Sequence, residues 1–154
     1  MNPEVLAYIN TQRVGVIAVE MTDGSPHAAT VHFAHHDDPL TFIFLTSPTY
    51  RKVEPLLQKE LVRASFVIGL EEVPGGKEKT FQLDGVARLL SADEEMLKKV
   101  YFAKFPSKEG KHPDDVFFMF TPIWWRFTDW ANPAGKTILT SDGKKLVKGI
   151  PVNT

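Results

Sequence analysis

Residues 44–68 read FLTSPTYRKVEPLLQKELVRASFVI, with an apolar stretch at each end and a polar segment between them. The apolar ends are typical of strands that are buried in a protein core. Ser47 and Pro48 favour the start of a helix, which we expect to continue to about Lys59. Pro55 lies inside this helix and should kink or restart it. The stretch therefore predicts a strand, a short helix and a second strand.

The expected helix start carries positive charge where acidic residues are usual. Arg51 and Lys52 lie in its first turns, and no acidic residue of the segment precedes Glu54. Two cations are unfavourable near the free N–H groups of a helix start, and a bound anion removes that conflict. The hydroxyls of Thr46 and Ser47 would complete a phosphate site. The alternative is a basic, solvated start of a helix.

Antiparallel strands are predicted on both sides of this segment. On its N-terminal side we expect a helix at 2–11 and strands at 13–21, 27–35 and 40–45, separated by short turns. On its C-terminal side we expect strands at 62–70 and 80–90, a helix at 91–105, and a long strand at 116–130 broken at Thr121-Pro122. Segments 137–140 and 146–150 would form a final hairpin. This pattern predicts one mainly β domain over residues 1–154, a small antiparallel β-barrel with peripheral helices.

Composition excludes several classes of function. The chain has 154 residues, a formal net charge of −1 and no cysteine. The missing cysteine excludes disulfides, thiolate metal sites and a cysteine nucleophile. The near-zero charge argues against nucleic-acid binding. No apolar run is long enough to cross a membrane, and the first residues lack a signal-peptide pattern, so we expect a cytoplasmic protein.

A cluster of histidines and aspartates lies at residues 32–38. Histidines 32, 35 and 36 precede Asp37 and Asp38, and we interpret this group as a polar turn rather than a metal site. The sequence also lacks the nucleophile and phosphate-loop motifs of common hydrolases, so any catalysis would need a cofactor. A barrel of this size has little room inside, so a cofactor would bind on its outer surface or at a dimer interface.

Trp124, Trp125 and Arg126 belong to the densest aromatic region of the sequence. Adjacent residues of a strand face opposite ways, so one tryptophan enters the core and the other does not. The outward tryptophan would face solvent, a partner or a planar ligand.

The pattern of a strand, Thr-Ser, three residues, Arg-Lys, a helix and a strand resembles the flavin phosphate segment of the pyridoxamine 5′-phosphate oxidase-like family. The order of elements from about residue 3 to residue 130 is similar as well. This resemblance implies an antiparallel, Greek-key-like split β-barrel that binds FMN, with the phosphate and ribityl chain on Thr46, Ser47, Arg51 and Lys52. It also implies that the backbone of Thr30, Val31 and His32 lies along the isoalloxazine ring.

The family is usually a homodimer with each flavin at the subunit interface. The resemblance therefore implies that Trp124, Trp125 or Arg126 of a second copy completes the site. The stretch HAATVHF at 27–33 lacks the arginine that pyridoxamine phosphate oxidases carry on this strand. The tail SDGKKLVKGIPVNT at 141–154 lacks their arginine- and histidine-containing substrate motif.

We therefore expect an FMN-dependent oxidoreductase that acts on a different small molecule. Three alternatives stay open at this point. The chain could be a flavin-binding module without turnover, the same fold with F420 or haem, or a structural dimer without a ligand. An F420 tail is anionic and would use basic residues such as the lysines after Gly135.

Overall fold

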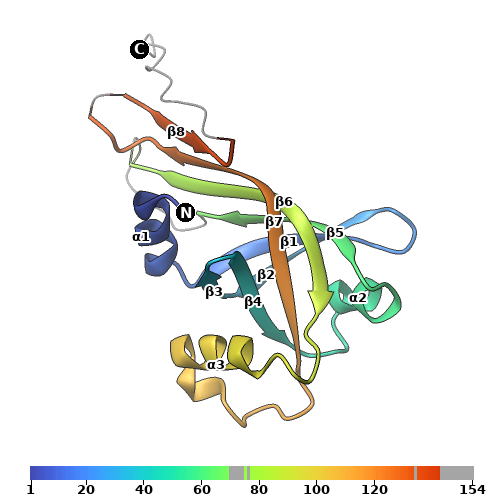
Figure 1. Cartoon of the computed structure of the whole chain (residues 1–154). Helices are drawn as coiled ribbons and strands as arrows, with labels where there is room; N and C mark the ends of the chain where they lie inside the picture. Colours follow the sequence, from blue (N-terminus) through green and yellow to red (C-terminus); the bar gives the residue numbers. More distant parts are fainter. Residues whose placement is uncertain (70–74, 76, 134, 143–154) are drawn as a thin grey trace.

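The computed structural model describes residues 1–69, 75, 77–133 and 135–142, in which one curled antiparallel sheet dominates (Figure 1). Its helical elements are α1 (Pro3–Thr11), η1 (Arg51–Val53), α2 (Glu54–Gln58), α3 (Glu95–Lys104) and η2 (Pro106–Lys108). Its strands are β1 (Val14–Glu20), β2 (Pro26–His32), β3 (Ala34–Asp37), β4 (Leu40–Thr46), β5 (Val62–Ile68), β6 (Lys79–Leu89), β7 (Val116–Asp129) and β8 (Thr137–Thr140). Within these residues, no helix combines the length and apolar character that a bilayer crossing requires.

The strand order makes the sheet a split barrel. Neighbouring strands follow the order β2-β1-β5-β6-β7-β4-β3, β8 pairs with β7, and the pairings are antiparallel. β2 and β3 are consecutive in sequence but lie at the two ends of this order, so the sheet curls until its ends approach each other. The predicted mainly β split barrel is confirmed.

Phenylalanine rings fill the inside of the barrel. Phe66 of β5 is fully buried, and its ring centroid lies 5.3 Å from Phe33, 5.1 Å from Phe42 and 5.3 Å from Phe44. At Gly15 of β1, a Cβ atom would come within 2.6 Å of the Phe66 ring, so a glycine is needed there. The packed interior leaves the outer surface of the barrel for a ligand.

Two predicted elements differ from the structure. The strand expected at 27–35 is divided at Phe33, because this buried residue turns into the core and its N–H donates to the Arg13 carbonyl at 3.1 Å. The helix expected from Ser47 begins at Glu54 instead, with the η1 turn before it. Proline has no N–H and fits the first turn of a helix. Pro55 therefore fixes where α2 begins, and the prediction that the helix restarts at this proline is confirmed.

The C-terminal half departs from expectation at two further places, and the first is α3, which begins at Glu95 and not at residue 91. β7 is continuous where a break was predicted, and it carries a bulge instead. Asp84 pairs with Trp124 and Gly85 pairs with Pro122, so Ile123 is the extra residue of β7. Of the final hairpin, the described residues include β8, whereas 146–150 and three of the four tail lysines lie outside them.

Helix α3 covers one end of the barrel, where it packs on β3 and β4 (Figure 1). On the other face of β3 lies His35, whose ring centroid is 6.3 Å from that of Phe42, whose side chain is 7% exposed, and whose Nε2 lies 3.1 Å from Asp37 Oδ1. Its Nδ1 is buried and has no hydrogen-bond partner among the described residues. Burial lowers the pKa of His35 below its ordinary value of 6.5, Lys104 adds to this effect, and Asp37 opposes it. His35 is therefore neutral in the folded protein at neutral pH.

We expect His35 to make the fold sensitive to acid. Unfolding releases the imidazole to its ordinary pKa, so the unfolded chain binds the proton more tightly than the folded one. The free energy of unfolding should therefore fall as the pH drops below 6.5. Urea unfolding at about pH 7.5 and about pH 5.5 measures this loss, which should be smaller in His35→Gln than in the parent protein. An equal loss of unfolding free energy in both proteins would contradict the role given to His35.

Candidate functional site

A pocket of about 590 Å³ opens where the curl of the sheet brings β2 beside the end of β4. We call it the β2–β4 pocket. Its third wall is the segment that follows α3. The residues that line it are Thr30, Val31, His32, Leu45, Thr46, Ser47, Tyr50, Lys52, Ser107, Lys108, Lys111, His112 and Asp115. Six of the sequence-predicted site residues are thus brought together, namely Thr30, Val31, His32, Thr46, Ser47 and Lys52.

Lys52 is the buried charge of this pocket. Its side chain is 6% exposed, and its Nζ lies 4.4 Å from the centroid of the Tyr50 ring. Burial lowers the pKa of Lys52, and in the described residues no carboxylate forms an ion pair with it. A buried cation without a counter-charge is unfavourable. A bound anion would provide the missing charge, with the hydroxyls of Thr46 and Ser47 beside it.

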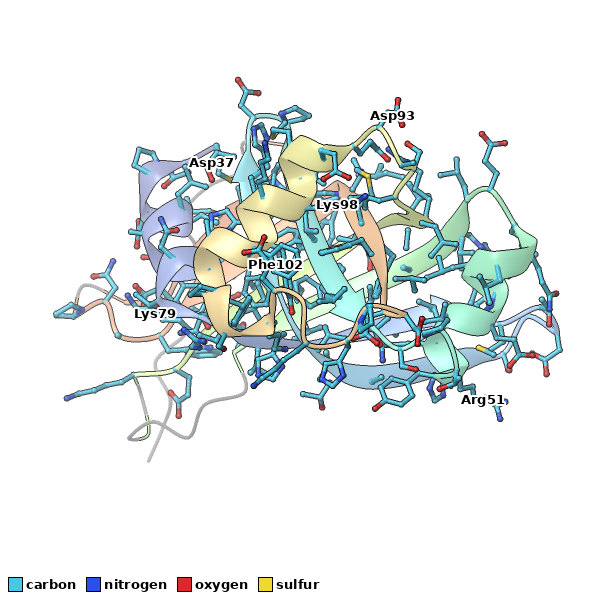
Figure 2. All side chains as sticks on the ribbon, turned by 90° about the horizontal axis from the view of Figure 1, so that it is seen from below. Asp37, Arg51, Lys79, Asp93, Lys98 and Phe102 are labelled. Atoms are coloured by element: carbon cyan, nitrogen blue, oxygen red, sulfur yellow. The ribbon has the colours of Figure 1, made fainter. Side chains whose placement is uncertain are left out.

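Arg51 does not join this group. It is exposed and does not line the pocket, and Figure 2 shows it pointing away from the body of the protein. The prediction placed Arg51 and Lys52 together on the assumption of a helix that begins at Ser47. In the structure they are consecutive residues of the η1 turn, which has about three residues per turn, so their side chains project about 120° apart.

Trp124, Trp125 and Arg126 lie on β7, away from this pocket. Trp125 packs against the core with its ring 5.6 Å from Phe81, whereas Trp124 is 37% exposed, so the predicted division of the pair is confirmed. Trp124 lines a second hollow of about 660 Å³ on the outer face of β1, β5 and β6. The Nε of Arg126 is buried and finds no hydrogen-bond partner in the described ranges.

The third wall of the pocket was missed by sequence reasoning. Ser107, Lys108, Lys111, His112 and Asp115 come from a loop that reads as an ordinary polar connection. Three basic residues within five positions directly after an amphipathic helix were the signal available in the sequence. Burial lowers the pKa of Lys108, and its Nζ donates to the Tyr101 hydroxyl at 3.3 Å.

Comparison with protein families was decisive for the class of fold. The family model for pyridoxamine 5′-phosphate oxidase matches residues 1–129, which is most of the chain. The chain belongs to the pyridoxamine 5′-phosphate oxidase family. The predicted resemblance is thereby confirmed. Comparison with curated proteins found no match.

Solved structures with the fold of the pyridoxamine 5′-phosphate oxidase family include a protein of the pyridoxinephosphate oxidase family and a heme-binding protein. One is a Clostridium acetobutylicum protein of the pyridoxinephosphate oxidase family, with 17% identity, a TM-score of 0.61, and coverage of 90% of this chain and 93% of that one. Another is a heme-binding protein from Mycobacterium smegmatis, with 16% identity, a TM-score of 0.66, and coverage of 87% of this chain and 55% of that one. This chain therefore spans about half the length of the mycobacterial protein.

A third structure is HutZ, the heme storage protein of Vibrio cholerae, with 19% identity and a TM-score of 0.58. The alignment covers 79% of this chain and 89% of HutZ. At these identities the likeness shows the fold and leaves the ligand to be argued from this chain's own residues.

Proposed function

We propose that the protein is an FMN-binding oxidoreductase that holds its cofactor in the β2–β4 pocket and acts on a small molecule. One observation supports this most strongly. Lys52 is buried in the pocket that Thr46 and Ser47 also line, and it forms no ion pair with a carboxylate of the described residues. The phosphate of FMN has the charge and the acceptor oxygens that such a group of donors requires.

The other walls of the pocket also fit a flavin. Its volume of about 590 Å³ is in the range of cofactor pockets. β2 is the last strand of the sheet order and pairs with β1 along one edge. Antiparallel pairing turns the backbone groups of Val31 toward Gly15 of β1, so Thr30 and His32 present theirs on the other edge, where they could bond to ring nitrogens and oxygens. When bound, FMN would supply the electron transfer, and the chain would bind and orient it.

We also propose that two copies pair through the outer face of β1, β5, β6 and β7. Val16 and Val67 face outward as a cross-strand pair and are half-buried in the single chain. On β7, two strands along the sheet from Val67, Ile123 is 75% exposed and Trp124 is 37% exposed. Apolar side chains gathered on one sheet face are typical of an interaction surface. Such pairing would allow Trp124 or Arg126 of one copy to reach the flavin of the other, whereas Trp125 packs against the core of its own chain.

Haem is the second candidate, and a specific feature of the pocket favours it. His32 and His112 both line the β2–β4 pocket, and an imidazole is a common haem ligand. Lys108 and Lys111 would suit the two carboxylates of haem. Binding of F420 would depend more on the lysines after Gly135, and lysines 144, 145 and 148 lie outside the described residues.

The visible spectrum of the purified protein tests the proposal. We expect about one flavin per chain to remain after FMN is added and the excess removed, and haem not to displace it. Sedimentation of the same sample should give the mass of two chains. Retention of haem but not of FMN would favour the second candidate. Retention of neither would contradict ligand binding in this pocket, and a mass of one chain would contradict the pairing.

A further inference from the structure

The five histidines of the chain lie in different environments. His27 and His36 do not line the β2–β4 pocket, and the side chain of His35 is buried against Phe42. His32 and His112 both line the pocket and are both exposed, and His112 belongs to the loop after η2. His32 is therefore the pocket histidine that belongs to a strand of the barrel.

His32 is an exposed residue whose ring contacts one aromatic side chain of the core. It meets the Phe105 ring edge-on, with centroids 5.6 Å apart and planes at 82°. Phe105 is 3% exposed, so this contact is fixed by the core beneath α3. The imidazole forms no hydrogen bond with any residue in the described part of the chain. Both ring nitrogens thus remain available to a ligand or to water.

Cations gather around the same Phe105 ring. Its centroid lies 4.8 Å from Arg13 Cζ, 5.3 Å from Lys108 Nζ and 5.8 Å from Lys104 Nζ. Burial, with Lys108 and Arg13 adding to it, lowers the pKa of His32 below its ordinary value. Burial lowers the pKa of Lys108, and Asp115, the carboxylate that lines the pocket, partly opposes this effect. His32 is therefore neutral at neutral pH, and it shares the wall of the pocket with the cation Lys108.

We propose that His32 takes up a proton when a flavin in the β2–β4 pocket is reduced, and returns it on reoxidation. The inference rests on the proposed function. When bound, the flavin would accept two electrons from an external reductant such as dithionite, together with one proton, and would then carry one negative charge. That charge offsets the repulsion from Arg13 and Lys108, so the imidazole gains a proton from solvent. The sum is two electrons and two protons, one proton on the ring and one on His32.

The midpoint potential of the FMN-loaded protein, measured against pH by reductive titration, tests this proposal. In the parent protein the midpoint potential should fall with pH with the slope expected for two protons per two electrons. This slope should hold over the pH range in which His32 is neutral before reduction and charged after it. In His32→Gln the slope should halve over the same range, because one proton is lost from the reaction. His112→Gln removes the other histidine of the pocket and should keep the parent slope.

Histidine titration by NMR gives a second readout that needs no substrate. In the FMN-free protein the pKa of His32 should lie below its ordinary value and should rise in Arg13→Gln. In the loaded parent protein it should rise again on reduction. Equal slopes in parent and His32→Gln, or a His32 pKa that does not respond to reduction, overturn the inference while FMN binding stands. A parent protein that retains no flavin overturns both proposals.

Discussion

Replacement of Lys52 by methionine should weaken FMN binding by about two orders of magnitude or more, because a buried charge-assisted contact to phosphate is lost. Methionine keeps most of the length of the side chain and removes the charge. Arg51→Met is the matched control, since Arg51 is adjacent in sequence, exposed and outside the pocket. Its effect should stay within about threefold. Quenching of FMN fluorescence measures both affinities.

The stability of the Lys52→Met protein without FMN should move in the opposite direction. The parent protein buries a cation that has no carboxylate partner among the described residues, so an apolar replacement should raise the free energy of unfolding by about 1 kcal/mol. Weaker binding together with higher stability is the signature of a ligand-binding charge. Equal loss of affinity in Arg51→Met and Lys52→Met, or lower stability in Lys52→Met, would contradict the assignment.

The sequence was informative where local chemistry decides the structure. Asn2 caps α1 through a hydrogen bond from the Glu4 N–H at 2.8 Å, as expected from Asn-Pro at a helix start. Thr46, Ser47 and Lys52 were assigned to an anion site from hydroxyl and charge types alone, and the structure places them in one pocket. Which cofactor they bind remains a prediction.

The remaining parts of the site depend on contacts between distant segments. The wall that includes Lys108 is set by how α3 packs on β3 and β4, and no local pattern reports that packing. Similarly, the side chains of Arg51 and Lys52 diverge because α2 begins late, with Pro55 in its first turn. The prediction had placed the helix start at Ser47, because Ser47 and Pro48 favour one. Pro55 was the stronger signal, because a proline favours the first turn of a helix over its interior.

Phe66→Ala should lower the free energy of unfolding by about 3–5 kcal/mol, a large share of the total stability of about 5–15 kcal/mol of a domain. Phe66 is fully buried, and its ring meets those of Phe33, Phe42, Phe44 and Phe120, so truncation leaves a cavity where both halves of the barrel meet. Urea unfolding followed by tryptophan fluorescence measures the change.

The control for this prediction is Leu57→Ala, because Leu57 is 57% exposed and lies on α2 outside the barrel. Its change in stability should stay within about 0.5 kcal/mol. The barrel core also holds β2 against the end of β4, so FMN capacity of Phe66→Ala should fall with the folded fraction. A loss below about 1 kcal/mol would show that the aromatic core collapses around the cavity. The closure of the split barrel, and with it the pocket, would then depend on contacts other than the Phe66 ring.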